Sequence, residues 1–148
     1  MCLIVDVNIA RDVFGGSEEP EFFVIRQALY QKASNSVKLV YGGHLRVEYL
    51  RVEAVRRALR VLDQAGRARQ ISDAVVDAEQ KSVEQMSICV SNDAHIIALA
   101  RTANVRLLCS HDQALHTDFT NKKLIDEPRG KVYQKAAHKH LIKKFCAE

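Results

Sequence analysis

Residues 91–112 read SNDAHIIALARTANVRLLCSHD, and in this stretch a helical pattern leads directly into a buried strand. Apolar residues recur at helical spacing from residue 92 or 93 to Ala103, and Asn104 is a residue tolerated at a left-handed helix end. Residues 105–109 form a short apolar run that is typical of a buried strand. The stretch therefore predicts a helix followed by a strand of a central sheet.

The rest of the chain repeats this alternation. Two further apolar runs, residues 3–5 and 37–41, predict buried strands, and residues 130–133 predict a late edge strand. Segments with helical spacing are found at residues 20–34, 44–64, 73–86 and 136–145. Strands alternating with helices of this length predict an α/β fold with a mostly parallel sheet covered on both faces. No repeat or linker interrupts residues 1–148, so we expect one domain with a basic C-terminal extension over about residues 124–148.

The composition is that of an ordinary globular protein, with 47% hydrophobic and 27% charged residues. No apolar run approaches the length of about 18 residues that crosses a membrane, and the N-terminal run is short and lacks a basic leader. The four cysteines are far apart, and Cys2 and Cys109 lie in apolar runs where a thiol acts as a small hydrophobic side chain. We therefore expect a cytoplasmic protein without disulfides and without a membrane partner.

The basic residues are concentrated in two segments. Residues 122–148 carry eight Lys or Arg against three acids, and residues 46–69 carry seven arginines against three acids. Either segment could contact phosphates, and either could be a solvated surface. The candidates for phosphate contacts are Arg46, Lys139, Lys143 and Lys144. The absence of Trp and the scarcity of other aromatic residues argue against recognition by base stacking.

Two acids follow predicted strands. Asp6 comes directly after the strand at residues 3–5, and Asp112 comes three residues after the strand that ends at Cys109. If both strands are parallel, the two acids lie at the same edge of the sheet, where α/β proteins bind their ligands. The alternative for Asp6 is that it caps the helix that follows.

Glu48 interrupts an apolar stripe. The stripe consists of Leu45, Val52, Val55 and Leu59, which recur at helical spacing, and Glu48 projects from the middle of it. An unpaired buried carboxylate costs several kcal/mol. We therefore expect Glu48 to have a partner, either an arginine or a cation.

Asp93 opens the helix of the stretch quoted first. Taken alone, Asp93 is most simply explained as the N-cap of this helix. It shares a face with the apolar residues of the helix, however, and Ser91 or Asn92 could cap the helix just as well, which would leave Asp93 to turn inward. Four acids in one crevice would repel each other unless a cation neutralises them. Mg²⁺ and Mn²⁺ prefer carboxylate ligands, and such all-carboxylate sites suit phosphate chemistry.

The order of these acids resembles the pattern of the PIN-domain family. The four motifs are LIVDVNI with Asp6, GGHLRVEYL with Glu48, SNDAHIIALA with Asp93, and VRLLCSHD with Asp112. Asn8 and Ser110 match small polar positions beside the first and last acid. The resemblance covers about residues 1–121 and rests on the ordered set of four, because each motif alone is weak.

The resemblance implies a three-layer α/β/α fold and a metal-dependent endoribonuclease. Asp6, Asp93 and Asp112 would hold Mg²⁺ or Mn²⁺, and Glu48 would bind the metal or orient its water. Hydrolysis of RNA would leave a 5′-phosphate and a 3′-hydroxyl. Many small bacterial members are toxins neutralised by an antitoxin and dimers are common, so we expect RNA, an antitoxin or other protein, and a second copy as candidate partners.

The chain departs from the family pattern after Asp112. The segment QALHTDF follows, and its Asp118 is either a fifth acidic site position or a solvated acid before a loop. The basic extension, with His138 and His140 among its lysines, either grips RNA or forms the polar side of a terminal helix, the interpretation that we favour.

Two other functions stay open. A catalytically silent PIN-like module would keep the acids and bind RNA or protein without cutting. Another metal-dependent phosphotransfer enzyme, such as a phosphatase of the haloacid-dehalogenase type, needs a second aspartate two residues after Asp6, where the chain has Asn8. A Rossmann cofactor domain is excluded by the lack of a GxGxxG motif.

Overall fold

The computed structural model describes residues 2–31 and 37–146, which form one sheet with helices around it. In these residues five parallel strands lie in the order β3-β2-β1-β4-β5. The strands are β1 (Leu3–Val5), β2 (Leu39–Gly42), β3 (Ala68–Ile71), β4 (Leu107–Cys109) and β5 (Lys131–Tyr133). The expected parallel sheet is therefore confirmed.

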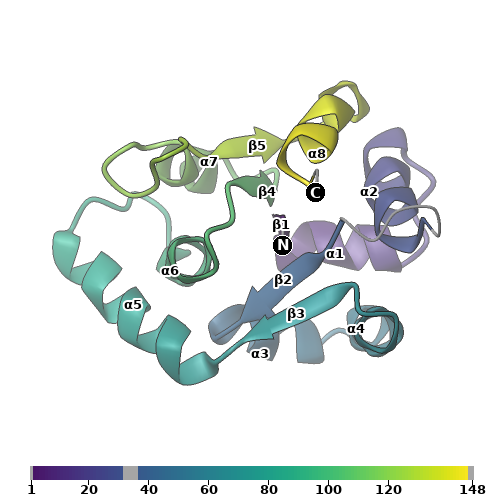
Figure 1. Ribbon diagram of the computed structural model, residues 1–148, viewed down its shortest axis with the longest axis horizontal. Helices are drawn as coiled ribbons and strands as arrows, with labels where there is room; N and C mark the ends of the chain where they lie inside the picture. Colours follow the sequence, from purple (N-terminus) through teal and green to yellow (C-terminus); the bar gives the residue numbers. More distant parts are fainter. Residues whose placement is uncertain (1, 32–36, 147–148) are drawn as a thin grey trace.

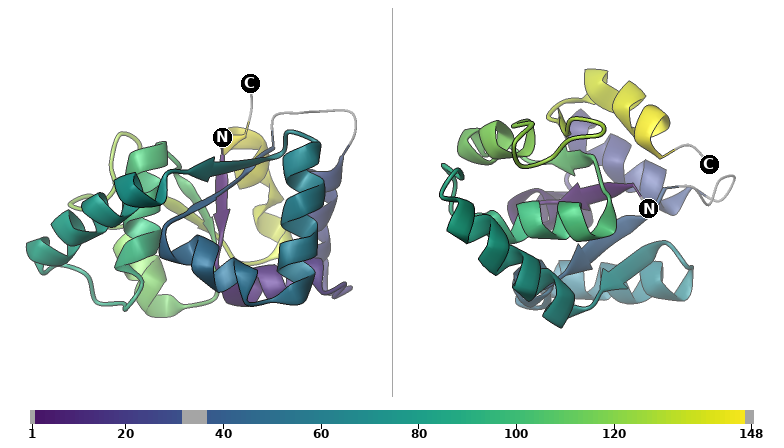
Figure 2. Two further views of the ribbon diagram at one scale, coloured as in Figure 1. Left: turned by 90° about the horizontal axis from the view of Figure 1, so that it is seen from below. Right: turned by 60° about the vertical axis from the view of Figure 1, so that its left-hand side comes forward.

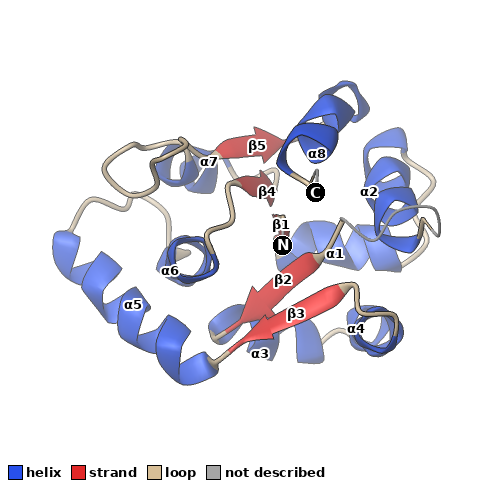
Figure 3. Ribbon diagram, viewed as in Figure 1, coloured by secondary structure: helices blue, strands red, loops and turns tan. Residues whose placement is uncertain are grey.

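Helices cover both faces of the sheet, so the fold has three layers, α/β/α, as expected (Figures 1 and 3). In Figure 1, α5, α6 and α7 lie to the left of the sheet and α1, α2, α4 and α8 to the right. The helices are α1 (Val7–Phe14), α2 (Pro20–Tyr30), α3 (His44–Leu50), α4 (Glu53–Gln64), α5 (Asp73–Met86), α6 (Ala94–Ala103), α7 (Gln113–Phe119) and α8 (Lys139–Phe145), with the 3-10 helix η1 (Ala136–His138) before α8. Among the described residues, no helix has both the length and the apolar character that crossing a membrane requires.

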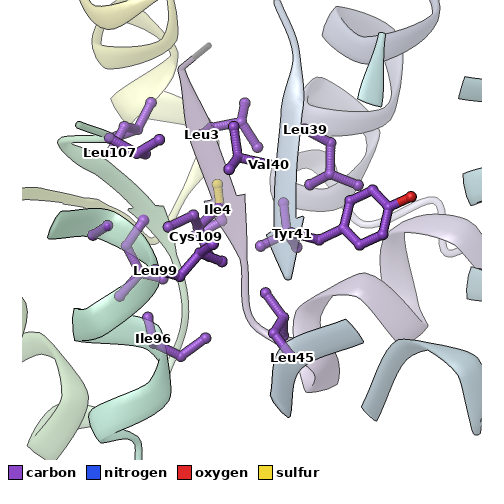
Figure 4. Packing of buried hydrophobic residues seen from close by; sticks show 14 of the residues in the cluster. Leu3, Ile4, Leu39, Val40, Tyr41, Leu45, Ile96, Leu99, Leu107 and Cys109 are labelled. Atoms are coloured by element: carbon purple, nitrogen blue, oxygen red, sulfur yellow. The ribbon is translucent and has the colours of Figure 1, made fainter. Parts of the chain in front are cut away.

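The central strands are buried on both faces. Every residue of β1 and β4 is buried, and Figure 4 shows their side chains meeting Ile96 and Leu99 of α6 in one apolar cluster. Burial of one such aliphatic side chain contributes about 1.5–3 kcal/mol. The continuous apolar runs that predicted these strands are what a sheet covered on both faces requires.

The order of the strands predicts a ligand crevice beside β1 and β4. From β1 the chain moves outward to β2 and β3, and it then returns to form β4 on the other side of β1. The direction of the crossovers therefore reverses between β1 and β4, which pair in register from Leu3↔Leu107 to Val5↔Cys109. At such a point the helices diverge beyond the carboxyl ends of the strands and leave room for a ligand. Figure 2 shows β1 running toward the end of the sheet where α1 and α3 lie.

The single helix expected over residues 44–64 is wrong, because the chain breaks into α3 and α4. Val52 is extended, with φ −110° and ψ 115°. The backbone N–H of Arg51 closes the last turn of α3 on Glu48, and Arg56 donates to the carbonyl of Leu50 at 3.0 Å. The break lets α3 turn across the end of the sheet while α4 packs along the sheet face. Val52 is consequently only partly buried and does not continue the stripe formed by the buried residues of α4.

Other boundaries agree with the sequence more closely. Helix α5 has the expected bounds, and α6 ends at Asn104 in the expected left-handed conformation with φ 56°. Helix α2 ends at Tyr30, whereas the expected end at Ser34 lies outside the described residues. The terminal helix expected at residues 136–145 is divided into η1 and α8.

Strand β3 was missed in the sequence. Its four residues, ARQI, contain two exposed polar side chains and no continuous apolar run. It pairs with β2 through all four residues, from Leu39↔Ala68 to Gly42↔Ile71. As an edge strand it needs burial on fewer sides, so the apolar pattern that marks the inner strands is absent.

The expected absence of disulfides is wrong, because Cys2 and Cys146 form one. These residues are 144 positions apart in the sequence, but the fold brings their Cα atoms to 4.9 Å. The start of β1 and the end of α8 therefore lie side by side. Cys109 is free and buried, as expected. The disulfide removes cysteine usage as a reason for a cytoplasmic location, and the compartment stays a prediction.

Candidate active site

Asp6 lies at the carboxyl end of β1 and is 9% exposed. It occupies the N-cap position of α1, but its side chain makes no capping hydrogen bond, so capping does not explain this residue. Instead, the hydroxyl of Ser110 donates to Asp6 Oδ2 at 3.1 Å. The same hydroxyl accepts the backbone N–H of Asp112 at 3.0 Å. Ser110, which is 1% exposed, thus joins the ends of β1 and β4, as expected for a supporting polar residue.

The fold disfavours the negatively charged form of Asp6. Burial raises its pKa, the charges of Asp93 and Glu48 raise it further, and the hydrogen bond from Ser110 opposes them. Asp93 and Glu48 influence Asp6 because α6 and α3 bring them to the same end of the sheet. The convergence of these three acids is the arrangement that the sequence predicted.

Asp93 occupies the N-cap position of α6, and its side chain makes no capping hydrogen bond. Its backbone N–H is bound by the hydroxyl of Ser91 at 3.2 Å. Burial is the largest cause that raises the pKa of Asp93, and the charges of Asp112 and Glu48 add to it while His95 opposes it. The carboxylate is therefore left for a function other than capping.

Glu48 is 24% exposed and accepts a hydrogen bond from His95 Nε2 to its Oε1 at 2.8 Å. The expected partner was an arginine or a cation, and the partner in the structure is this histidine. Burial acts to raise the pKa of Glu48, but His95, with smaller contributions from His44 and Arg51, lowers it below its usual range. The protein thus favours the charged form of Glu48, whereas it disfavours the charged forms of Asp6 and Asp93.

A tight turn before α3 sets the position of Glu48. Gly43 has φ 59°, and a Cβ atom there would lie 2.7 Å from Val76 Cγ1. Only glycine fits this left-handed turn beside α5. At the other end of α3, the buried Tyr49 donates its hydroxyl to the carbonyl of Val5, which ties α3 to the end of β1.

Asp112 and Asp118 differ from the other acids. Asp112 is exposed and caps α7 by accepting the backbone N–H of Leu115 on Oδ1 at 3.2 Å. Asp118 is 1% exposed and accepts the N–H groups of Val90 and Ser91, both at 2.9 Å, and the Ser91 hydroxyl at 2.6 Å. The interpretation of Asp118 as a solvated acid is therefore wrong. Its hydrogen bonds anchor the loop that leads to Asp93, whereas the expectation of a fifth acidic site position stays a prediction.

The expected phosphate-binding residues are not gathered at the acids. Arg46 pairs with Asp73 at 3.3 Å. Lys143 and Lys144 lie on the last turn of α8, which the disulfide ties to Cys2 at the start of β1, the end of the sheet opposite the crevice. Lys139 begins the same helix. Asn8 is exposed on the first turn of α1.

His95 and His44 were missed in the sequence. The His95 ring is 5% exposed and meets the exposed His44 ring edge to face, with centroids 4.9 Å apart. A histidine on an apolar helix face is ordinarily taken as a core residue. The signal that could have found it is that Glu48 also lies on an apolar face and needs a partner.

Two pockets lie along α5, and none of the four acids is among the residues that line them. A pocket of about 440 Å³ lies between α3 and α5, with His44 and Asp77 in its lining, and a second of about 320 Å³ includes Ser91 and Asn92. Gln80 and Glu84 of α5 line both pockets. A groove along α5 thus passes the start of α6, where Asp93 lies.

The donor set suits a hard divalent cation. Carboxylates are the ligands that Mg²⁺ and Mn²⁺ prefer. Burial, together with the charges of neighbouring acids, raises the pKa of Asp6 and of Asp93, and a bound cation would offset both effects. Within residues 2–31 and 37–146, no three His, Cys, Asp or Glu side chains are close enough together to form a metal site as they stand. Small side-chain rotations would therefore have to accompany binding.

Comparison with known proteins gives no further guide. No protein-family model matches the chain, no curated protein matches it, and no solved structure matches its fold. Function is therefore inferred from the positions of the acids in the fold and from their order along the chain.

Proposed function

We propose that the protein is a divalent-metal-dependent endoribonuclease of the PIN type. The observation that carries this proposal is the position of Asp6 and Asp93: Asp6 is almost buried at the carboxyl end of β1, and neither side chain caps the helix that it precedes. Burial raises the pKa of Asp6, and the charge of Asp93 raises it further. Buried carboxylates that repel each other are destabilising, so their presence calls for a counter-ion. The order of the four acids along the chain supports the PIN resemblance.

Each acid has a role in this proposal. Asp6 and Asp93, joined by the free oxygen of Asp112, would hold Mg²⁺ or Mn²⁺. The bound cation would supply Lewis-acid activation of the attacking water and the phosphoryl group. Ser110 keeps Asp6 and the start of α7 at a fixed separation. Glu48, on α3, would bind the metal or orient the water that attacks the phosphodiester.

An RNA substrate is supported by the charge of α4. Arg56, Arg57 and Arg60 are exposed on this helix, which starts directly after the helix that carries Glu48. Arg51 is near enough to lower the pKa of Glu48. A polyanionic strand could therefore run from this face into the crevice. The opposite wall carries Asp77 and Glu84, which would repel phosphates.

The alternative is a catalytically silent module that binds RNA or protein. It is favoured by one observation, that no three ligating side chains in the described residues stand at metal-binding distance. A protein partner such as an antitoxin and a homodimer are compatible with either function.

The test is cleavage of labelled single-stranded and structured RNA with Mn²⁺, with Mg²⁺ and with EDTA. Asp6→Asn removes one of the proposed ligands, and Asp12→Asn removes an exposed acid of α1 as the matched control. Metal-dependent cleavage by the wild type and Asp12→Asn, lost in Asp6→Asn, is the expected result. Metal binding without cleavage of any RNA would favour the silent module.

A further inference from the structure

The hydrogen bond from His95 restrains the side chain of Glu48 to one orientation. Its Nε2 lies 2.8 Å from Glu48 Oε1, and the imidazole is almost fully buried on α6. The exposed ring of His44 packs against it at an interplanar angle of 87°. A buried ring has few alternative rotamers, so the donor atom has a defined position.

Glu48 needs such a restraint. A glutamate side chain has three rotatable bonds, and fixing it costs up to about 2 kcal/mol of rotamer entropy. Glu48 also lies near the end of α3, a helix of seven residues that stops at Leu50. Without a partner, its carboxylate would sample several positions in the crevice.

The same turn of α6 presents both His95 and Asp93. Asp93 occupies the N-cap position, and His95 is the second residue of the helix. The hydrogen bond from His95 therefore fixes the Glu48 carboxylate relative to α6, the helix that begins at the proposed metal ligand Asp93. The hydrogen bond uses Oε1 and leaves Oε2 as the oxygen outside this contact.

We propose that His95 is a positioning residue that dedicates Glu48 to orienting the attacking water and keeps it from binding the metal. This inference rests on the proposed nuclease function and decides between the two roles that were open for Glu48. The metal is then held by Asp6, Asp93 and Asp112. Loss of His95 affects the chemical step and leaves metal and RNA affinity in place.

The experiment compares the wild type with His95→Ala, His95→Gln, Glu48→Gln and Asp93→Asn. Glutamine can place a side-chain N–H near the position of Nε2, so His95→Gln is the conservative variant. For each protein, kcat and KM are measured on one labelled RNA, and the Mn²⁺ dissociation constant is measured by calorimetry. Melting curves set the assay temperature well below the transition of the least stable variant.

The expected results separate chemistry from binding. His95→Ala lowers kcat about 10- to 100-fold, because misplacing a reacting group by about 1 Å costs up to this factor. Its KM and its Mn²⁺ dissociation constant stay within about threefold of the wild type, as does the Mn²⁺ dissociation constant of Glu48→Gln. His95→Gln recovers most of kcat, whereas Asp93→Asn weakens Mn²⁺ binding at least about tenfold.

Three results would overturn the inference. The first is a loss of Mn²⁺ affinity in Glu48→Gln as large as in Asp93→Asn, which would make Glu48 a metal ligand. The second is unchanged kcat in His95→Ala, and the third is an equal loss in the alanine and glutamine variants. A wild type that binds Mn²⁺ without cutting RNA refutes the nuclease and with it the role of Glu48 toward water, whereas the calorimetric comparison still shows whether Glu48 is a metal ligand. A wild type that binds no Mn²⁺ refutes both.

Discussion

Replacing Asp118 by asparagine tests whether this acid is an anchor or a metal ligand. Asparagine has nearly the same shape, so the substitution leaves no cavity. Asp118 accepts three hydrogen bonds, two from the backbone N–H groups of Val90 and Ser91 and one from the Ser91 hydroxyl. In the variant, one carboxylate oxygen becomes an NH₂ group that points at a donor.

The expected loss of stability follows from these contacts. A hydrogen bond to a charged acceptor contributes about 1.5–3 kcal/mol, and a buried donor left unpaired costs about 1–3 kcal/mol. Asparagine can keep the bonds to one oxygen and loses at least one bond at the other. We therefore expect the free energy of unfolding to fall by about 3 kcal/mol, and Tm to fall by about 6–12 °C for a chain of this size.

The assay is urea unfolding, with Asp12→Asn as the control for the loss of an exposed carboxylate. The control is expected to change the free energy of unfolding by less than about 0.5 kcal/mol. At a temperature where the Asp118→Asn variant is folded, it is expected to bind Mn²⁺ with an affinity close to that of the wild type. A variant as stable as the control that has lost Mn²⁺ binding would refute the anchor and make Asp118 a fifth ligand.

Three further predictions follow from the fold. Cys146→Ser removes the disulfide to Cys2, which joins residues 144 positions apart in the sequence. The free energy of unfolding, measured in urea without reductant, should therefore fall by up to about 5 kcal/mol, while RNA cleavage is unchanged. Asp6→Asn should stabilise the metal-free protein at pH 7, because asparagine is neutral where the fold disfavours a charged aspartate. The raised pKa of Asp6 contributes stability that is fully present below its ordinary pKa of 3.8 and is lost as the pH rises through the raised value. The gain in the free energy of unfolding of the variant, measured in urea, should therefore shrink as the pH falls toward 3.8. Changing Arg56 and Arg60 together to glutamine should raise KM for RNA several-fold and reduce the salt dependence of KM, whereas the same change at Lys143 and Lys144 should have little effect. Equal losses of RNA affinity in the two double variants, measured by fluorescence anisotropy, would contradict an RNA path along α4.

The inner strands could be predicted from the sequence, because burial on both faces requires each residue of the strand to be apolar. Strands β1 and β4 are buried on both faces and therefore consist of unbroken apolar residues. Edge strand β3 carries the exposed Arg69 and Gln70, so no such run marks it. The break at Val52 also has no local signal, because it is imposed by the packing of α3 and α4 on different parts of the sheet.

The candidate site was predictable to a similar extent. Asp6 and Asp93 could be found because Asp6 ends an apolar strand and Asp93 begins an apolar helix. The pairing of His95 with Glu48 was missed because the two residues are 47 positions apart in the sequence, and only the need of Glu48 for a partner pointed to it. The bond between Cys2 and Cys146 is non-local in the same way.

The most direct test of the proposed site is the cleavage of one labelled RNA by the wild type and by Asp93→Asn at saturating Mn²⁺, with the product ends identified. We expect the wild type to cut the RNA, leaving 5′-phosphate and 3′-hydroxyl ends, and EDTA to abolish this cleavage. In Asp93→Asn, the cleavage rate should fall at least about a hundredfold. Cleavage of equal rate in the variant, or cleavage that continues in EDTA, would contradict it.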